Sequence, residues 1–140
     1  MKYYLASPFF NPKERNGVET IAQCLRKRGH EVYVPMEHEI PNAWDMPNKD
    51  WAKAVFDEDI KAIDNCEKVI VLNWGMYSDS GTAWECGYAY AKQKEVITLL
   101  MPSREKEYSL MMINGSTKAM PWLDFVENRE WANLNAINQK

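Results

Sequence analysis

Residues Lys68–Asn73 have the sequence KVIVLN, in which four branched apolar side chains follow one another. A strand that is apolar on both faces is typical of a parallel sheet covered by helices on both sides. Shorter runs of this kind lie on either side of it, at Tyr3–Ala6, Glu31–Pro35, Glu95–Met101 and Lys118–Met120. Segments with helical spacing separate these runs, and such alternation predicts parallel βαβ units.

The helices expected between the strands are marked by apolar spacing and by end signals. Val18, Ile21 and Leu25 repeat at helical intervals, and Arg26–Gly29 supplies a cationic last turn and a glycine stop. Further helices are expected at about 50–65, through Glu85 to about 93, near 108–112 and at 122–131. The sequence therefore predicts a single α/β domain over residues 1–140, a three-layer sandwich with a five-stranded, mostly parallel, doubly wound sheet of the flavodoxin-like type.

Composition excludes several classes of function. The 140-residue chain is 46% hydrophobic and 26% charged with a net charge of -3, so we expect neither disorder nor a nucleic acid partner. Its first residues do not resemble a signal peptide, and no apolar run approaches the ~18 residues that span a bilayer, which favours a cytoplasmic protein without a membrane partner. Three cysteines without CxxC spacing and two histidines favour neither a disulfide framework nor a metal site. The cysteines are expected to be small core residues.

Ligands of open parallel sheets bind outside the carboxyl ends of the strands. The segments that follow the expected strands include 7–10, 35–39 and 74–81, and the last of these leads into the helix that carries Glu85. Asp79 and Glu85 are carboxylates six residues apart, and Gly81 and Gly87 leave room for a ligand beside them. Neither GxGxxG nor GxxxxGK[ST] is present, so the sequence predicts a sugar-handling site and no cofactor.

Three segments carry a resemblance to a known family. They are YLASPFF at 4–10, FDEDI at 56–60 and DSGTAWECGYA at 79–89, and the last contains Asp-x-Gly-x-x-x-Glu-x-Gly after a Val/Ile strand. In this order the segments resemble the nucleoside 2-deoxyribosyltransferase family over nearly the whole chain. The resemblance implies an enzyme of nucleotide salvage that exchanges the purine or pyrimidine base of 2'-deoxyribonucleosides.

The resemblance also implies a role for each matching residue. Glu85 matches the nucleophile, which forms a covalent deoxyribosyl intermediate and so retains the anomeric configuration. Asp59 matches a carboxyl group that moves a proton on or off the base, and Tyr4 matches a tyrosine that orients the nucleophile. Asp79 matches a carboxylate that holds a sugar hydroxyl. Phe10 matches an aromatic residue near the carbon on which a ribose carries its 2'-hydroxyl.

Positions further along the chain match residues that contact the base or cross a subunit boundary. Glu39 stands where many members have a glutamine that contacts the base. Ser109 and Met111 stand where members contribute side chains to the site of a neighbouring subunit. The resemblance thus implies a homo-oligomer, a tetramer or hexamer built from dimers, that binds deoxynucleosides and free nucleobases.

Elementary electrostatics supports a carboxylate nucleophile. Cleavage of an N-glycosidic bond builds positive charge on the sugar, which an ionised glutamate stabilises and captures. We expect Glu85 near the start of its helix, where unpaired N–H groups favour an anion, and a tyrosine hydroxyl would favour that anion further. Absence of the 2'-hydroxyl eases formation of the cationic state.

Other interpretations of these residues remain open. Thr82–Glu85 is also a capping box, in which Glu85 would only reach back to the helix start. Tyr4 and Phe10 could be ordinary core aromatics. Asp57 and Glu58 are interpreted as the solvated face of a helix.

The roles of two tryptophans and two alternative functions of the protein are also left open. Trp44 and Trp74 are interpreted as packing residues, with Trp44 also a candidate for a lid. The alternative activity is hydrolysis of 2'-deoxynucleoside 5'-monophosphates by an N-glycosidase, in which water replaces the second base. A nucleoside-binding module without turnover is the third hypothesis.

Overall fold

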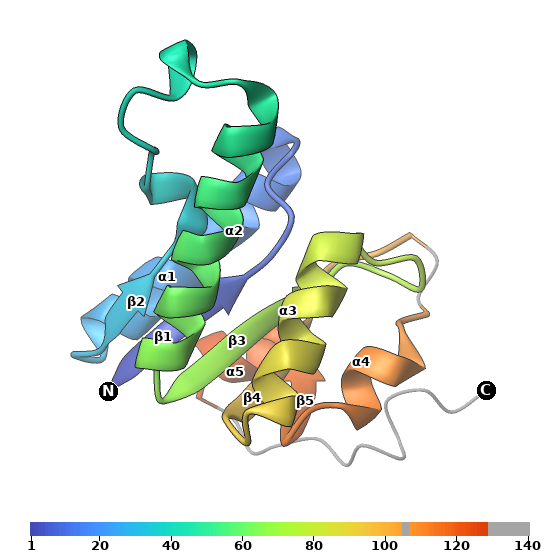
Figure 1. Cartoon of the computed structure of the whole chain (residues 1–140). Helices are drawn as coiled ribbons and strands as arrows, with labels where there is room; N and C mark the ends of the chain where they lie inside the picture. The colour runs from blue at the N-terminus through green and yellow to red at the C-terminus, as the bar shows by residue number, and fades with distance from the viewer. Residues whose placement is uncertain (105–106, 129–140) are drawn as a thin grey trace.

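The computed structural model describes residues 1–104 and 107–128, which build one five-stranded sheet in the order β2-β1-β3-β4-β5 (Figure 1). Each pairing between neighbouring strands is parallel. The strands are β1 (Lys2–Ala6), β2 (Glu31–Tyr33), β3 (Lys68–Asn73), β4 (Glu95–Leu100) and β5 (Lys118–Pro121). This order confirms the predicted doubly wound α/β fold, with a sheet that is parallel throughout.

Helices cover both faces of the sheet, as Figure 1 shows. The two helices α1 (Pro12–Lys27) and α5 (Trp122–Val126) pack on one face. On the other face lie α2 (Asn48–Asn65), α3 (Ser80–Ala91) and α4 (Leu110–Asn114). The result is the expected three-layer sandwich.

The central strand β3 contributes to both cores because alternate side chains point to opposite faces. Ile70 and Leu72 pack toward α1, whereas Val69 and Val71 pack toward α2 and α3. All four are 0% exposed, and burial of each contributes about 1.5–3 kcal/mol to folding. The unbroken apolar run is therefore what a strand with two covered faces requires.

Several predicted elements end earlier than expected, and the second strand and the last helix show why. Strand β2 ends at Tyr33, because Pro35 has no N–H to donate and opens a 3-10 turn over Pro35–Glu37. The last helix ends at Val126, and Asn128 beyond it adopts the left-handed region with φ 56°. Trp131, at which that helix was expected to end, lies outside the described residues.

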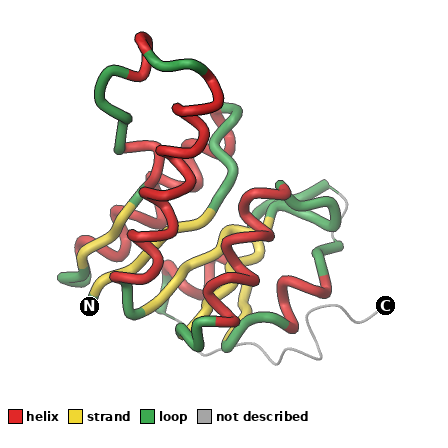
Figure 2. Tube along the Cα trace, in the orientation of Figure 1, coloured by secondary structure: helices red, strands yellow, loops and turns green. Residues whose placement is uncertain are grey.

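Loops at the carboxyl ends of the first three strands gather at one end of the sheet, which Figure 2 shows in green. Trp74, which follows β3, donates its Nε1 hydrogen to Ser7 Oγ at 3.2 Å and so joins the loops after β1 and β3. Its ring lies against α1, where a Cβ on Gly17 would come within 2.6 Å of it. Trp74 is thus a packing residue, as interpreted, and it fixes this end of the sheet.

The cysteines lie in or beside the two cores, as expected. Cys66 and Cys86 are buried, Cys24 packs at the margin of a core, and all three are free thiols. Within residues 1–104 and 107–128, no helix has the length and apolar character needed to cross a membrane.

Candidate active site

The site begins with a contact between the first strand and the third helix. Tyr4 is 0% exposed on the face of β1 that α2 and α3 cover, and its hydroxyl donates to Glu85 Oε2. These residues are 81 positions apart in the chain. Glu85 therefore points to the sheet rather than back to the start of its own helix.

Asp79, and not Thr82, is the N-cap of α3. Asp79 Oδ2 accepts hydrogen bonds from the Thr82 backbone N–H at 2.9 Å and from Thr82 Oγ1 at 3.0 Å. The capping-box interpretation of Thr82–Glu85 is therefore wrong. Gly81 lies against this cap, since a Cβ there would be 3.2 Å from Asp79 Oδ2, whereas a Cβ on Gly87 would meet nothing within 4 Å.

Burial dominates the ionisation of Glu85. Glu85 is the sixth residue of α3, beyond the N–H groups that the first turn leaves unpaired. Desolvation raises its pKa to about 7; the hydrogen bond from Tyr4 opposes this rise, and the charges of Asp59 and Asp79 add to it. The expectation that the helix start would keep Glu85 strongly anionic is thus wrong, because the side chain lies too far along the helix and too deep.

Asp59 on α2 belongs to the same cluster. Burial, with a smaller contribution from the neighbouring charge of Glu58, raises its pKa to about 6 against the opposing effect of His38. Burial, with the charges of Glu85 and Asp59, also holds the pKa of Tyr4 far above its ordinary range, so its hydroxyl remains a donor. The structure therefore brings together the three predicted catalytic residues, two carboxyl groups that exchange protons near neutral pH and a tyrosine that does not.

The remaining predicted binding residues lie nearer the surface. Phe10 is 76% exposed and stacks on Phe9, so its interpretation as a core aromatic is wrong. Glu39 is exposed, Met111 is 85% exposed, and Ser109 is the N-cap of α4. None of these four candidates is buried within this chain.

A column of stacked rings next to Tyr4 was missed by the sequence analysis. Tyr33 pairs in register with Tyr4, so their side chains share a face and stack with ring centroids 5.6 Å apart. His38 stacks on Tyr33 at 4.1 Å, because the turn opened by Pro35 folds the chain back. Strand register and a turn create this column, and neither is visible as a motif.

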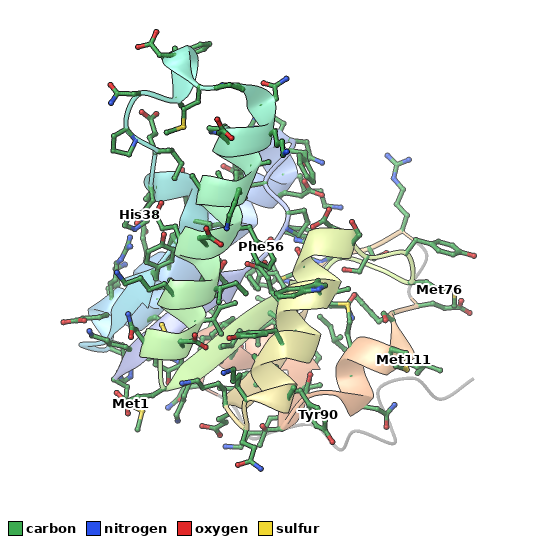
Figure 3. The ribbon with its side chains drawn as sticks, viewed as in Figure 1. Met1, His38, Phe56, Met76, Tyr90 and Met111 are labelled. Carbon is green, nitrogen blue, oxygen red and sulfur yellow. The ribbon has the colours of Figure 1, made fainter. Side chains whose placement is uncertain are left out.

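A second group of aromatic rings lies between α2 and α3. Phe56 of α2 meets Trp84 of α3 edge to face at 5.2 Å, and Trp84 stacks on Tyr88 at 5.4 Å. Figure 3 shows Phe56 on the α3 side of α2 and His38 on the opposite side, toward β2. Trp44, the lid candidate, is 100% exposed in the loop before α2.

The described part of the chain has no cluster of side chains arranged to bind a metal ion. Residues 1–104 and 107–128 contain no group of three or more His, Cys, Asp or Glu side chains placed to hold an ion.

Comparisons with known proteins identify related sequences and structures. The sequence profile of the nucleoside 2-deoxyribosyltransferase family matches residues 3–120. A solved 2-deoxyribosyltransferase from the psychrotolerant bacterium Bacillus psychrosaccharolyticus is 30% identical with a TM-score of 0.79, and the match covers 100% of this chain and 98% of that one. Among curated protein sequences, none matches this chain.

More distant structures share the fold. A CMP N-glycosidase of Clostridium botulinum is 21% identical over 91% of this chain and 97% of its own, with a TM-score of 0.62. A conserved protein from Enterococcus faecalis V583 is 20% identical with a TM-score of 0.61, and the match covers 96% of this chain and 92% of that one. At these identities the likeness concerns the architecture and not the reaction.

Proposed function

This chain belongs to the nucleoside 2-deoxyribosyltransferase family, and we propose that it transfers 2-deoxyribose from one purine or pyrimidine base to another through a covalent ester on Glu85. One observation carries the proposal. Glu85, fixed by the Tyr4 hydroxyl, lies in one cluster with a second carboxyl group, Asp59, whose pKa burial raises to about 6. Such a pair supplies a nucleophile and a proton donor.

In the first half-reaction the protonated Asp59 gives its proton to the departing base. The bond between the base nitrogen and C1' breaks, and a carboxylate oxygen of Glu85 forms a bond to C1' from the opposite face. The products are a neutral free base, an ionised Asp59 and the deoxyribosyl ester of Glu85. Tyr4 keeps the second oxygen of Glu85 in place, which orients the first toward C1'.

The second half-reaction reverses these steps with a different base. A nitrogen of the incoming base attacks C1' while its proton passes to Asp59, and the ester bond to Glu85 breaks. Two inversions at C1' give net retention, and the cycle consumes no proton. Neither a metal nor a redox cofactor takes part in this scheme.

The binding roles proposed for the other residues are those that the family resemblance implies. Oδ2 of Asp79 caps α3, so its other carboxylate oxygen would accept the sugar hydroxyl. Phe10 would lie beside C2' and disfavour a ribose, and Glu39 would contact the base. Ser109 and Met111, which are not buried in this chain, would complete the site of a neighbouring subunit in a homo-oligomer.

The helix starts favour a nucleoside over a nucleoside monophosphate as the substrate. Helix N-termini bind phosphate through unpaired N–H groups. At α1, however, Asn11 Oδ1 accepts from the Glu14 N–H at 2.8 Å, and Glu14 Oε1 accepts from the Phe10 N–H at 2.9 Å. At the start of α3, the Asp79 carboxylate accepts a hydrogen bond from the Thr82 N–H. Both positions thus carry an anion that repels phosphate.

Base exchange by purified protein tests the proposal. The protein is incubated with a deoxynucleoside and a second free base, and the exchanged deoxynucleoside is measured for the wild type and for Glu85→Ala. We expect exchange by the wild type and none by the folded variant. Absence of exchange by the wild type, or equal rates for both proteins, would contradict the proposal.

Two further measurements separate it from the alternatives. Faster turnover of a deoxynucleoside 5'-monophosphate than of the nucleoside, with free sugar phosphate as product, would favour the hydrolase. Incubation with a 2-fluoro-2-deoxy analogue should leave a covalent adduct on Glu85 detectable by mass spectrometry, which a module that only binds nucleosides cannot form.

A further inference from the structure

The loop over residues 7–11 presents two aromatic rings to the solvent. Phe9 is 39% exposed, Phe10 is 76% exposed, and the two rings stack with centroids 6.4 Å apart. The loop follows β1 at the carboxyl end of the sheet, where ligands of open parallel sheets bind. Since aromatic side chains are common in the walls of ligand sites, these rings lie where a substrate is expected.

The backbone of this loop is held on both sides of the rings. Before them, Ser7 Oγ accepts from Trp74 Nε1 at 3.2 Å, which ties the loop to the segment that leads from β3 to Asp79. After them, Asn11 is the N-cap of α1, and its Oδ1 accepts from the Glu14 N–H at 2.8 Å. The rings therefore extend from a loop that is anchored at both ends.

Glu14 departs from the usual pattern of helix capping. In a capping box, the acidic side chain at the third helical position accepts from the N–H of the N-cap residue. Glu14 occupies that position in α1, but its Oε1 accepts at 2.9 Å from the N–H of Phe10, the residue before the N-cap. The carboxylate thus holds the backbone of Phe10 itself.

The ring of Phe10 lacks the packing that commonly accompanies such a cap. An apolar residue in its place often packs against the fourth residue of the helix, in a hydrophobic staple. Here the fourth residue is Arg15, and its Nη1 donates to the Phe9 carbonyl oxygen at 3.2 Å. Two side chains of α1 therefore fix the backbone of Phe9 and Phe10, while the Phe10 ring stays in solvent. Helix stability alone does not explain a cap that leaves this ring exposed.

We propose that Glu14 is a positioning residue that holds Phe10 beside C2' of the sugar and so sets the preference for deoxyribonucleosides over ribonucleosides. This inference rests on the proposed function, in which Phe10 lies beside C2'. A ring fixed there would clash with a 2'-hydroxyl and bury it without a hydrogen-bond partner. Because the ring itself is largely exposed, the bond from the Phe10 N–H to Glu14 is what keeps it in place.

The ratio of kcat/KM for 2'-deoxyadenosine to kcat/KM for adenosine tests the inference. A hydrogen bond to a charged group shifts an equilibrium by about tenfold or more, so we expect this ratio to fall about tenfold in Glu14→Ala. Glu14→Gln keeps an oxygen that accepts from the Phe10 N–H and should retain most of the preference. Glu19→Ala removes a carboxylate from an exposed position of the same helix and should leave the ratio unchanged.

A double-mutant cycle shows whether Glu14 acts through Phe10. Phe10→Ala removes the ring and should lower the ratio at least as far as Glu14→Ala does. Addition of Glu14→Ala to Phe10→Ala should then change the ratio no further. A purely structural role of Glu14 would lower the turnover of both nucleosides and leave their ratio unchanged. That result, or additive effects in the double variant, overturns the inference.

A second measurement reports the hydrogen bond without catalysis. Exchange of the Phe10 amide hydrogen with solvent, followed by NMR, should be slow in the wild type and in Glu14→Gln and about tenfold faster in Glu14→Ala. Equal exchange rates in the wild type and Glu14→Ala overturn the inference.

Failure of the inference can be told from failure of the proposed function. A wild type that exchanges bases but turns over both nucleosides equally well overturns only the inference. A wild type that exchanges no bases contradicts the proposed function. Calorimetric binding of the same two nucleosides then decides the role of Glu14, because a preference for 2'-deoxyadenosine that persists in Glu14→Ala overturns it.

Discussion

The two sides of the proposed site are built differently. On the α3 side, Asp79 caps the helix, and Glu85 is already bound to the fully buried Tyr4. On the α2 side, Asp59 is only half-buried next to Glu58, which lines an open groove between β2 and α2, and the Tyr33 hydroxyl has no hydrogen-bond partner among the described residues. The nucleophile thus belongs to a preorganised part of the protein, and the proton donor to a more open one.

The difference suits a reaction with one sugar and two bases. The proposed nucleophile meets the same C1' carbon in both half-reactions, so a fixed position benefits each of them. The proton donor must serve a departing base and then another of different shape. In the proposed reaction, an open α2 side would let the bases exchange while the sugar ester stays on the α3 side.

Among substitutions that leave the proposed nucleophile in place, the largest expected effect is on the α2 side. Asp59→Asn removes the proton donor, and we expect kcat for base exchange to fall by about 10²–10⁴-fold, the range of general acid catalysis. Substrates whose base departs readily without a proton should lose much less. Steady-state kinetics with a series of deoxynucleosides measures this dependence.

Asp57→Asn is the matched control for this change because it removes a carboxylate from an exposed position two residues away. It should leave kcat within about twofold of the wild type. An equal loss for all substrates in Asp59→Asn would mean that Asp59 supports structure, and the contrast between the two sides would fail.

On the α3 side, Tyr4→Phe removes the hydroxyl that donates to Glu85 and leaves the aromatic ring in place. Hydrogen bonds to charged groups are worth about 1.5–3 kcal/mol, so we expect a loss of about 10–100-fold in kcat. Since the Tyr4 bond lowers the pKa of Glu85, its removal should also move the acid limb of the pH profile upward from about 7.

Tyr3→Phe is the control, because Tyr3 precedes Tyr4 on β1 but packs in the core on the opposite face. It should leave the pH profile unchanged. An unshifted acid limb in Tyr4→Phe would show that the tyrosine does not act on the carboxylate that limits the rate.

The burial that holds Glu85 in place should lower the free energy of unfolding above neutral pH. The folded-state pKa of Glu85, about 7, exceeds its ordinary value of 4.5, so its burial is harmless below pH 4.5 and destabilising once pH rises through 7. Glu85→Gln keeps an acceptor for Tyr4 and removes the charge. Its free energy of unfolding should exceed that of the wild type by about 1–3 kcal/mol at pH 8 and equal it at pH 4.

Urea denaturation at both pH values measures this difference. Glu39→Gln makes the same chemical change at an exposed position and should alter stability little at either pH. A variant that is no more stable than the wild type at pH 8 would show that the Glu85 carboxylate is better solvated than its burial indicates.

Much of the fold and part of the site could be predicted from the sequence. The apolar run of β3 fixes a strand covered on both faces, and the Asp-x-Gly-x-x-x-Glu pattern locates Asp79 and Glu85. The ionisation of Glu85 was mispredicted because helix position was visible in the sequence and burial was not. The stacking of Tyr33 on Tyr4 was missed because strand register arises only on folding.

The choice of helix cap was also beyond the sequence, and it leads to the smallest expected effects. Asp79 and Thr82 are both good N-cap residues, and the structure uses Asp79. Asp79→Asn should keep the cap, with stability within about 0.5 kcal/mol of the wild type, while Asp79→Ala should lose about 1 kcal/mol. Both should raise KM for deoxynucleosides if the carboxylate also holds a sugar hydroxyl. Because asparagine replaces the cap but not the charge, a KM that changes only in Asp79→Ala would mean that Asp79 serves the helix alone.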